Sequence, residues 1–254
     1  MSGTFRGVGV GPGDPELMTL KAVRAIRKCG VIAVPVSDNS LEAPVFEKTG
    51  IESQYAEYLD RCVAFGIARG AVPEVGKKNR IFLPMPMIRE KEKLKNIHDM
   101  DADAVAGILE QGMDVVFLTL GDPTVYSTCM YVHKRLKKKG YSTELVPGIP
   151  SFCAASARMD ISLAENRQEL HILPASYQIE KGLELPGTKV LMKAGRKIAD
   201  VKKILIEKGM EAEMVENCGM ENERVYLSAE EIPEQAGYYS LLIVKEKSSG
   251  GEKI

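Results

Sequence analysis

The sequence predicts an α/β protein of two domains, with a mostly parallel N-terminal sheet and a mixed C-terminal sheet. Over roughly the first 160 residues, strand-like and helix-like stretches alternate and short turns join them. This alternation is typical of a parallel sheet that helices cover on both faces. Nearer the C-terminus, two strand-like runs follow each other with no long helix between them, which indicates antiparallel pairing.

The expected N-terminal elements follow from apolar patterning. Strands are predicted at 4–10, 31–35, 80–83, 115–120 and 142–146. The apolar, β-branched run at 31–35 is consistent with a strand buried on both faces, and 115–120 is the clearest buried strand. Helical spacing of apolar residues predicts helices at 19–28, 89–111, 126–139 and 151–158. Thr19 is a suitable N-cap for the first of these helices, and Gly112 is a suitable stop after the second.

The C-terminal half is built differently. Strands are expected at 169–173, 189–193, 212–216, 223–228 and 238–245, and an amphipathic helix at 197–208. The predicted domains are therefore 1–160 and 161–247, followed by a polar tail at 248–254. The stretch 39–79 fits the alternation least, although 53–66 has some helical character, and we interpret it as an insertion at the edge of the first domain.

Composition excludes several classes of protein. The chain has 254 residues, and its 34 basic and 35 acidic side chains give a formal net charge of −1, which argues against a general nucleic-acid binder. No apolar run reaches the roughly 18 residues of a membrane span, and no secretory signal is visible at the N-terminus. Five widely spaced cysteines without a Cys-x-x-Cys pair, and three scattered histidines, predict a cytoplasmic protein with no metal site.

Three glycine- or proline-bearing turns follow predicted strands, at 8–15, 119–128 and 146–152. Ligands of open α/β sheets bind at the carboxyl ends of the strands, so these turns are the candidate site. The first turn is not a dinucleotide loop, because neither Gly7/Gly9 nor Gly9/Gly11 has a further glycine three positions on. With little side-chain bulk, it could instead approach a flat ligand closely.

The second turn carries the most polar chemistry. Gly121 permits close approach of the backbone, and Asp122 could accept hydrogen bonds from a ribose or an amine. Ser127 and Thr128 have two interpretations that the sequence leaves open, since each could line a ligand or could cap the helix that follows.

These segments resemble the signatures of a known family. The segments 9–15 (GVGPGDP), 121–128 (GDPTVYST) and 146–152 (VPGIPSF) look like those of the tetrapyrrole (corrin/porphyrin) methylases. Within that family, 120–135, 170–177, 190–193 and 239–244 are similar to the C20-methyltransferases of cobalamin synthesis. The resemblance covers nearly the whole chain in order, and its main departure is the long stretch 39–79.

The resemblance implies two α/β domains with S-adenosylmethionine in the cleft between them, usually in a homodimer. The positions that it assigns to the cofactor come from several loops and from the second domain. They are Pro12, Gly121, Asp122, Val125, Ser127, Thr128, Ser151, Phe152, Ala175, Tyr177, Met192, Ser240 and Leu241.

The implied reaction is methyl transfer to the C20 meso carbon of cobalt-factor II (cobalt-precorrin-2), with metal-free precorrin-2 as the alternative substrate. The sulfonium is already activated and the meso carbon is electron-rich, so alignment and exclusion of water can carry the catalysis. No catalytic residue is assigned, in keeping with the absence of a nucleophile–base pattern. Basic residues should meet the substrate's carboxylates, and the candidates are Arg6, Arg89, Lys91, Arg158 and Lys193.

Three other functions compete with this one. Another methylase of the same fold, such as one acting on uroporphyrinogen III, diphthamide or ribosomal RNA, would share the general loops. An NAD-dependent oxidoreductase is disfavoured by the failed glycine pattern. A pure binding protein would not need three ligand-type turns along one sheet edge.

Overall fold

The computed structural model describes residues 2–49, 53–174 and 179–245, and its contacts divide the chain into two compact units. Unit 1 is Met1–Pro150 and unit 2 is Ser151–Ile254. The sequence had suggested a boundary ten residues later, with the segment 151–158 in the first domain. Helix α6 (Ser151–Met159) groups with unit 2 because it packs against strand β11 (Ser240–Lys245).

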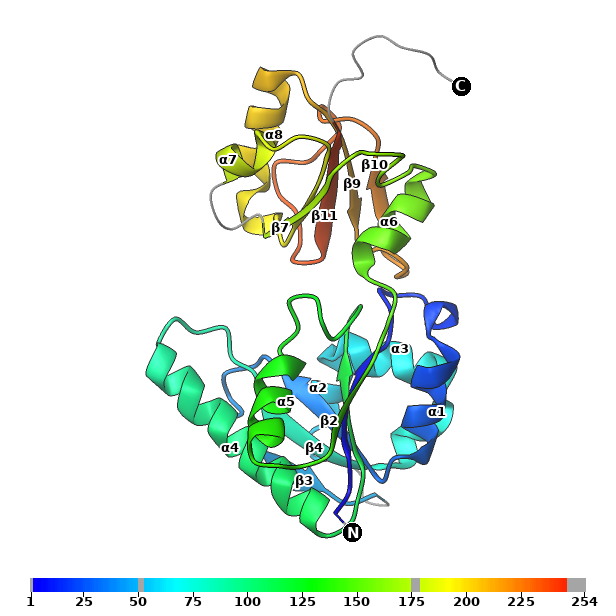
Figure 1. Ribbon diagram of the computed structural model, residues 1–254, viewed down its shortest axis with the longest axis vertical. Coiled ribbons are helices and arrows are strands. Elements are labelled where there is room, and N and C mark those ends of the chain that lie inside the picture. The colour runs from blue at the N-terminus through cyan, green and yellow to red at the C-terminus, as the bar shows by residue number, and fades with distance from the viewer. Residues whose placement is uncertain (1, 50–52, 175–178, 246–254) are drawn as a thin grey trace. The chain divides into compact units, whose positions relative to one another are not determined.

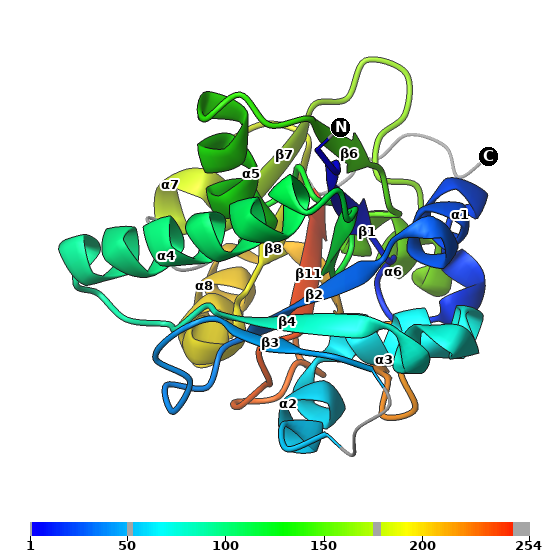
Figure 2. The same cartoon turned by 90° about the horizontal axis from the view of Figure 1, so that it is seen from below.

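Unit 1 contains a six-stranded sheet in the order β3-β4-β2-β5-β1-β6. All neighbouring strands are parallel except β3, which runs antiparallel to β4 at one edge of the sheet (Figure 2). The mostly parallel sheet predicted from the sequence is thus confirmed. The strands are β1 (Phe5–Gly9), β2 (Val31–Val36), β3 (Val45–Glu47), β4 (Asn79–Pro84), β5 (Val115–Thr119) and β6 (Thr143–Val146).

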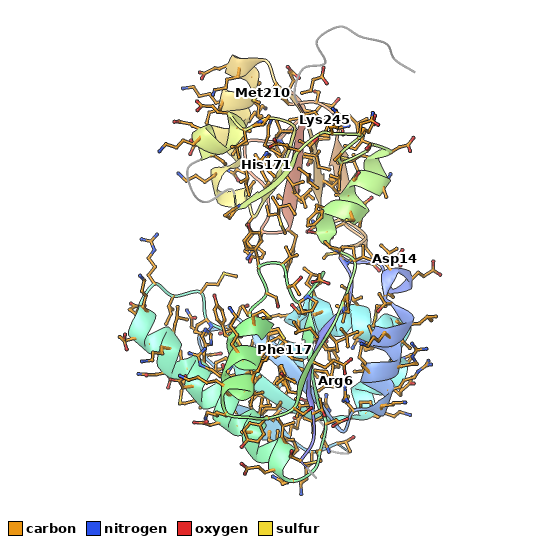
Figure 3. The ribbon with its side chains drawn as sticks, in the orientation of Figure 1. Arg6, Asp14, Phe117, His171, Met210 and Lys245 are labelled. Carbon is orange, nitrogen blue, oxygen red and sulfur yellow. The ribbon has the colours of Figure 1, made fainter. Side chains whose placement is uncertain are left out.

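Helices cover both faces of this sheet (Figure 1). Alternate residues along each strand point to opposite faces, so Val31 and Ala33 pack toward α4 and α5, whereas Ile32 and Val34 pack toward α1, α2 and α3. Phe117 of β5, labelled in Figure 3, meets Phe5 edge-to-face at 6.3 Å. The helices are α1 (Leu20–Lys28), α2 (Ala56–Arg61), α3 (Val63–Ala71), α4 (Lys91–Glu110) and α5 (Cys129–Lys138), with short 3-10 turns at Pro15–Leu17 and Pro73–Lys77.

The stretch 39–79 is built into the body of unit 1. It supplies the edge strand β3, and Phe65, Ile67 and Ala68 of α3 are buried in the core on the α1 face of the sheet. The single helix suggested at 53–66 is two helices, because the backbone at Cys62 is extended and separates α2 from α3.

Unit 2 contains a five-stranded sheet in the order β10-β9-β11-β8-β7. Only β7 and β8 are parallel, and the other pairs are antiparallel, which confirms the mixed sheet. The helices α7 and α8 lie on one side of it and α6 on the other (Figure 1). The elements besides α6 and β11 are β7 (Leu170–Pro174), α7 (Ile179–Leu183), β8 (Thr188–Met192), a 3-10 turn Gly195–Lys197, α8 (Ile198–Lys208), β9 (Glu211–Glu216) and β10 (Arg224–Tyr226).

Two further observations bear on the sequence predictions. Cys29, Cys62 and Cys129 are buried as expected, and burial raises the pKa of the Cys129 thiol to about 12, while Cys153 is exposed. None of the helices within the described residues is both long enough and apolar enough to cross a membrane.

Candidate functional site

The three predicted turns meet at the carboxyl ends of strands β1, β5 and β6 in the unit 1 sheet. Strand β1 lies between β5 and β6, and all three run parallel, so the loops that follow them leave the sheet side by side. Gly11 and Gly121 exchange backbone hydrogen bonds, from Gly121 N to Gly11 O at 2.7 Å and from Gly11 N to Gly121 O at 3.3 Å. The convergence of the loops, predicted from the sequence, is confirmed.

The glycines in these loops allow the backbones of neighbouring loops to contact each other directly. A Cβ at Gly148 would lie 2.1 Å from the carbonyl oxygen of Gly121, and a Cβ at Gly9 would lie 2.8 Å from the Cα of Gly148. Both distances are far inside van der Waals contact. The sequence suggests that the segment 9–15, with little side-chain bulk, can approach a flat ligand closely. At Gly9 itself, the backbones of Gly121 and Gly148 fill the space that a side chain would take.

Asp122 holds two of the loops together. Its Oδ1 accepts hydrogen bonds from the backbone N and the hydroxyl of Thr124, at 2.8 and 2.5 Å, and its Oδ2 accepts one from Gly148 N at 3.0 Å. The side chain is buried. An ionised carboxylate has about four lone-pair sites, so Asp122 keeps some capacity to accept a hydrogen bond from a ligand.

Ser127 lies one residue before the N-cap position of α5 and satisfies the first N–H of that helix. Its Oγ accepts a hydrogen bond from Cys129 N at 3.2 Å and lies 2.7 Å from the hydroxyl oxygen of Thr119. Of the two interpretations of Ser127, capping is therefore realised. Thr128 stands at the N-cap position of α5 but its side chain makes no capping hydrogen bond. The helix begins at Cys129, three residues later than predicted, because Tyr126 has a left-handed φ of 49°.

The other two predicted residues of unit 1 occupy the same loops. Pro12 is buried in the loop after β1, one residue after Gly11. Val125 is half-buried, and its N–H donates to the carbonyl oxygen of Asp122 at 3.3 Å, which closes a turn. All six predicted residues of unit 1 thus lie on the two loops that follow β1 and β5.

Three of the predicted residues of unit 2, Met192, Ser240 and Leu241, lie at one end of its sheet. Met192, the last residue of β8, pairs with Pro174 of β7 on one side and with Leu241 of β11 on the other. Ser240, the first residue of β11, is buried and donates its hydroxyl proton to Gly237 O at 2.7 Å. These residues therefore lie in one row across neighbouring strands.

Of the other predicted residues of unit 2, two lie in helix α6 and two lie outside the described residues. Ser151 is the first residue of α6, and Phe152 is buried. Ala175 and Tyr177 lie outside the residues that the structure describes.

Two of the candidate basic residues are engaged in ion pairs. Arg6, labelled in Figure 3, lies between Asp114 Oδ2 at 2.6 Å and Glu144 Oε2 at 3.0 Å. Hydrogen bonds to these two carboxylates raise the pKa of the Arg6 guanidinium against the opposing effect of burial. Arg158 pairs with Glu223. The charges of both arginines are therefore balanced within their own units.

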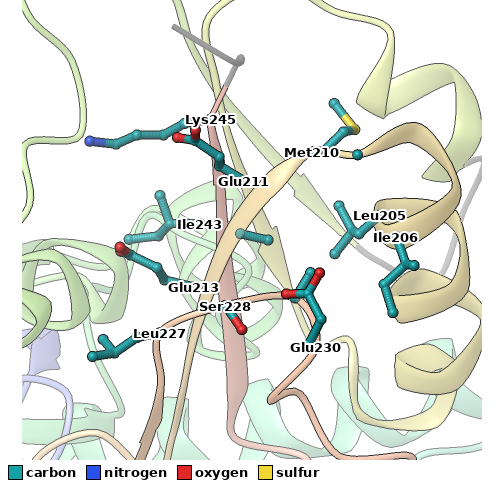
Figure 4. Close-up of a pocket in the computed structure, with 13 residues that line it drawn as sticks. Leu205, Ile206, Met210, Glu211, Glu213, Leu227, Ser228, Glu230, Ile243 and Lys245 are labelled. Atoms are coloured by element: carbon teal, nitrogen blue, oxygen red, sulfur yellow. The ribbon is translucent and has the colours of Figure 1, made fainter.

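A pocket of about 390 Å³ lies elsewhere in unit 2 (Figure 4). It is lined by the C-terminal part of α8, the first residues of β9 and the segment 227–230. Glu211, which lines the pocket, lies opposite Lys245 in the register of β9 and β11, whereas Glu216 lies opposite Ser240 at the other end of the same two strands. The pocket is thus at the opposite end of the sheet from Ser240 and contains none of the predicted site residues.

Within the described ranges, no cluster of three or more His, Cys, Asp or Glu side chains could hold a metal ion. His98 stacks on Tyr131 at 4.4 Å between ring centroids, and His171 contacts Glu169 at 3.0 Å.

The sequence patterns did not predict some features of the loops in unit 1 and of the segment before β11 in unit 2. The mutual packing of Gly9, Gly121 and Gly148 joins residues far apart in the chain, and only the recurrence of glycine after successive strands could have signalled it. Tyr238 and Tyr239, which precede Ser240, are exposed and in edge-to-face contact. A pair of aromatic residues directly before a strand was the available signal.

Comparison with known proteins gives one consistent family. Residues 4–233 match the family described as Tetrapyrrole (Corrin/Porphyrin) Methylases. A probable cobalt-precorrin-2 C(20)-methyltransferase of Methanocaldococcus jannaschii is 33% identical over 94% of each chain. A precorrin-2 C(20)-methyltransferase of Sinorhizobium sp. is 30% identical over 95% of each chain.

A solved structure supports the same fold. The uroporphyrin-III C-methyl transferase of Thermus thermophilus, in complex with S-adenosyl homocysteine, superposes with a TM-score of 0.62 at 20% identity. The match covers 96% of this chain and 98% of that one. With the family match over 4–233 and relatives at 33% and 30% identity, the chain belongs to the tetrapyrrole (corrin/porphyrin) methylases.

Proposed function

We propose that this protein is an S-adenosylmethionine-dependent C-methyltransferase that acts at C20 of cobalt-factor II (cobalt-precorrin-2) in anaerobic cobalamin biosynthesis. The observation that carries the proposal is the near full-length similarity to relatives named as C20-methyltransferases, at 33% and 30% identity. The converging loops of unit 1 also support the proposal, because they lie at the carboxyl ends of parallel strands, where open α/β sheets bind their ligands.

The cofactor supplies an activated methyl group, so the protein's own task is to bind and align. The candidate residues in the loops of unit 1, and those at the Ser240 end of the unit 2 sheet, fit the chemical groups of S-adenosylmethionine. In unit 1, Val125 offers a half-buried apolar side chain suited to an adenine ring, and Asp122 keeps lone pairs for a ribose hydroxyl. In unit 2, Met192 is likewise apolar and half-buried. Backbone hydrogen bonds between Gly11 and Gly121 hold two of the loops together, which favours alignment of the two reactants.

We extend this assignment to the whole set of candidate cofactor residues. In unit 1 they are Pro12, Gly121, Asp122, Val125, Ser127 and Thr128, and in unit 2 Ser151, Phe152, Met192, Ser240 and Leu241. For Ser127 and Ser240 the contact would come from the part of the side chain or backbone left free by the hydrogen bonds already described.

The cobalt-bound substrate is proposed over the metal-free one because the relative at 33% identity is named for cobalt-precorrin-2. The relative named for precorrin-2 is only slightly less similar, at 30% identity, so metal-free precorrin-2 is the second candidate substrate. In either case the metal belongs to the substrate and the protein contributes the surface that holds the macrocycle.

We also propose that the protein works as a homodimer in the cytoplasm. Its resemblance to the family supports the dimer, and the widely spaced free cysteines support a reducing compartment. Sedimentation analysis at micromolar concentration tests the dimer, and a monomer at every concentration would refute it.

Two experiments test the proposed function. In calorimetry, S-adenosyl homocysteine should bind and NAD should not; binding of NAD alone would favour the oxidoreductase. In the second, the protein is incubated with S-adenosylmethionine and with either cobalt-loaded or metal-free substrate, and mass spectrometry measures the addition of one methyl group. Faster turnover of the cobalt complex is expected, and equal turnover would show that the protein does not distinguish the two.

A further inference from the structure

Three side chains next to the candidate cofactor residues of unit 2 form a group of their own. Lys193 directly follows Met192 at the end of β8, and Tyr238 and Tyr239 directly precede Ser240 at the start of β11. Because β8 and β11 are antiparallel neighbours, with Met192 opposite Leu241, these side chains come from the same end of the sheet.

The group has the geometry of a cationic and aromatic surface. The Lys193 ammonium lies 5.7 Å from the centre of the Tyr238 ring, within the range of cation–π attraction. The rings of Tyr238 and Tyr239 meet edge-to-face at 5.3 Å and 82°. Their exposed fractions are 47% and 38%, so neither ring is a core residue, although both are large and apolar over most of their surface.

The loops that carry this group are tightly held. Lys193 has a left-handed φ of 60°, which is uncommon for a residue with a long side chain. A Cβ at Gly195 would lie 2.2 Å from the carbonyl oxygen of Gly237, so the two loops are in backbone contact. Glu216 Oε1 accepts a hydrogen bond from Gly237 N at 2.5 Å, and Asn217 N donates to Tyr239 O at 3.1 Å.

We propose that Lys193, Tyr238 and Tyr239 bind the tetrapyrrole substrate, with Lys193 pairing a peripheral carboxylate and the tyrosine rings contacting the flat macrocycle. The proposal rests on the proposed function and adds the residues that hold its substrate. A macrocycle with acidic side chains presents an apolar face and anionic rim, and an ammonium beside two exposed rings matches both.

The test compares four variants with the wild-type protein. Lys193→Gln removes the charge, Lys193→Arg keeps it, and Tyr238→Leu removes the ring that faces the ammonium. Lys203→Gln is the matched control, because Lys203 is an exposed lysine of unit 2 whose ion pair is with Glu207 on the same helix. The measured quantities are KM for the tetrapyrrole, kcat, and the Kd of S-adenosyl homocysteine.

We expect Lys193→Gln to raise KM for the tetrapyrrole about 10- to 100-fold, the range for a lost charge-assisted hydrogen bond, with kcat changed by no more than about twofold. Tyr238→Leu should raise KM by about tenfold, and Lys193→Arg should restore most of the wild-type value. The Kd of S-adenosyl homocysteine should stay unchanged in all four variants.

A direct titration separates this proposal from the proposed function. Uroporphyrin III, a flat tetrapyrrole with carboxylate side chains, is added to each variant and binding is followed by its absorption. Weaker binding to Lys193→Gln but not to Lys203→Gln supports the site even if no methyl transfer is observed. Unchanged binding and KM in Lys193→Gln overturn it, as does an equal loss of S-adenosyl homocysteine affinity, and a wild-type protein that binds no tetrapyrrole overturns both proposals.

Discussion

The carboxylate of Asp122 accepts a hydrogen bond from the backbone N–H of Gly148, with 3.0 Å between Oδ2 and N. The two residues belong to the loops after β5 and β6, which are not neighbouring strands, since β1 lies between them. This bond therefore reaches across the loop after β1 and fixes the shape of the whole edge. The candidate cofactor residues of unit 1 depend on that shape.

Removal of this carboxylate should disturb both stability and cofactor binding. In Asp122→Ala, the N–H groups of Gly148 and Thr124 lose a buried acceptor, which costs about 1–3 kcal/mol of unfolding free energy. The Kd of S-adenosyl homocysteine should rise at least about tenfold. The control is Asp14→Ala, because Asp14 caps a local turn by accepting a hydrogen bond from Glu16 N at 2.8 Å. Equal effects of the two substitutions on Kd would contradict the role of Asp122.

The backbone contact among the loop glycines predicts a steric effect. Gly148→Ala would place a Cβ 2.1 Å from the carbonyl oxygen of Gly121, so the loops must separate. Overpacking of this kind costs about 1–3 kcal/mol, measured by urea denaturation, and should weaken cofactor binding as well. Gly107→Ala is the control, since its Cβ would meet open space on helix α4 and should stabilise the protein by up to about 1 kcal/mol.

The buried carboxyl of Asp101 in α4 predicts a pH dependence of stability. Burial raises the pKa of Asp101 to about 6, against the smaller lowering effects of His98, whose Nδ1 lies 3.7 Å away, and of Arg135. The folded protein thus holds this proton more tightly than the unfolded chain does. The resulting stabilisation is fully present below about pH 4 and is lost as the pH rises through about 6.

Replacement of Asp101 should remove this dependence. Urea denaturation should show Asp101→Asn to be more stable than the wild-type protein at about pH 8, by up to about 3 kcal/mol, and similar to it at about pH 4. Asp103→Asn serves as control, because Asp103 is exposed on the same helix and pairs with Lys139. A variant that is less stable than the wild-type protein at both pH values would contradict the prediction.

The pairing of β3 with β4 encloses an ion pair. Arg80 Nε lies 3.2 Å from Glu47 Oε2, the two residues are opposite each other in the ladder, and both side chains are more than nine-tenths buried. Arg80→Met should therefore lower the free energy of unfolding by about 3–5 kcal/mol, because a buried carboxylate loses its counter-charge. The double variant Arg80→Met, Glu47→Leu should recover most of this loss. Full stability of the single variant would show that Glu47 is not held in place by Arg80.

Sequence patterns predicted the features that depend on local composition. The apolar runs located β2, β4 and β5 to within two residues at either end, because a strand buried on both faces needs a continuous apolar segment. Thr19 caps α1 through a hydrogen bond from Ala22 N at 3.1 Å, as expected. The meeting of the three loops followed from the parallel order of the strands that carry them.

Features that depend on long-range contacts could not be predicted. Strand β3 has three residues of ordinary composition, and it is a strand only because β4 offers a free edge beside it. The delayed start of α5 comes from the left-handed backbone of Tyr126, which no propensity signals. Asp122 and Gly148 are separated by 26 residues, so their hydrogen bond exists only in the folded chain.

Methyl transfer to C20 can be followed with S-adenosylmethionine whose methyl carbon is labelled with carbon-13. After incubation with cobalt-factor II, nuclear magnetic resonance of the product locates the label. We expect one labelled methyl group at C20, with the product's mass increased by one methyl. A label at any other carbon, or no transfer to either the cobalt-bound or the metal-free substrate, would contradict it.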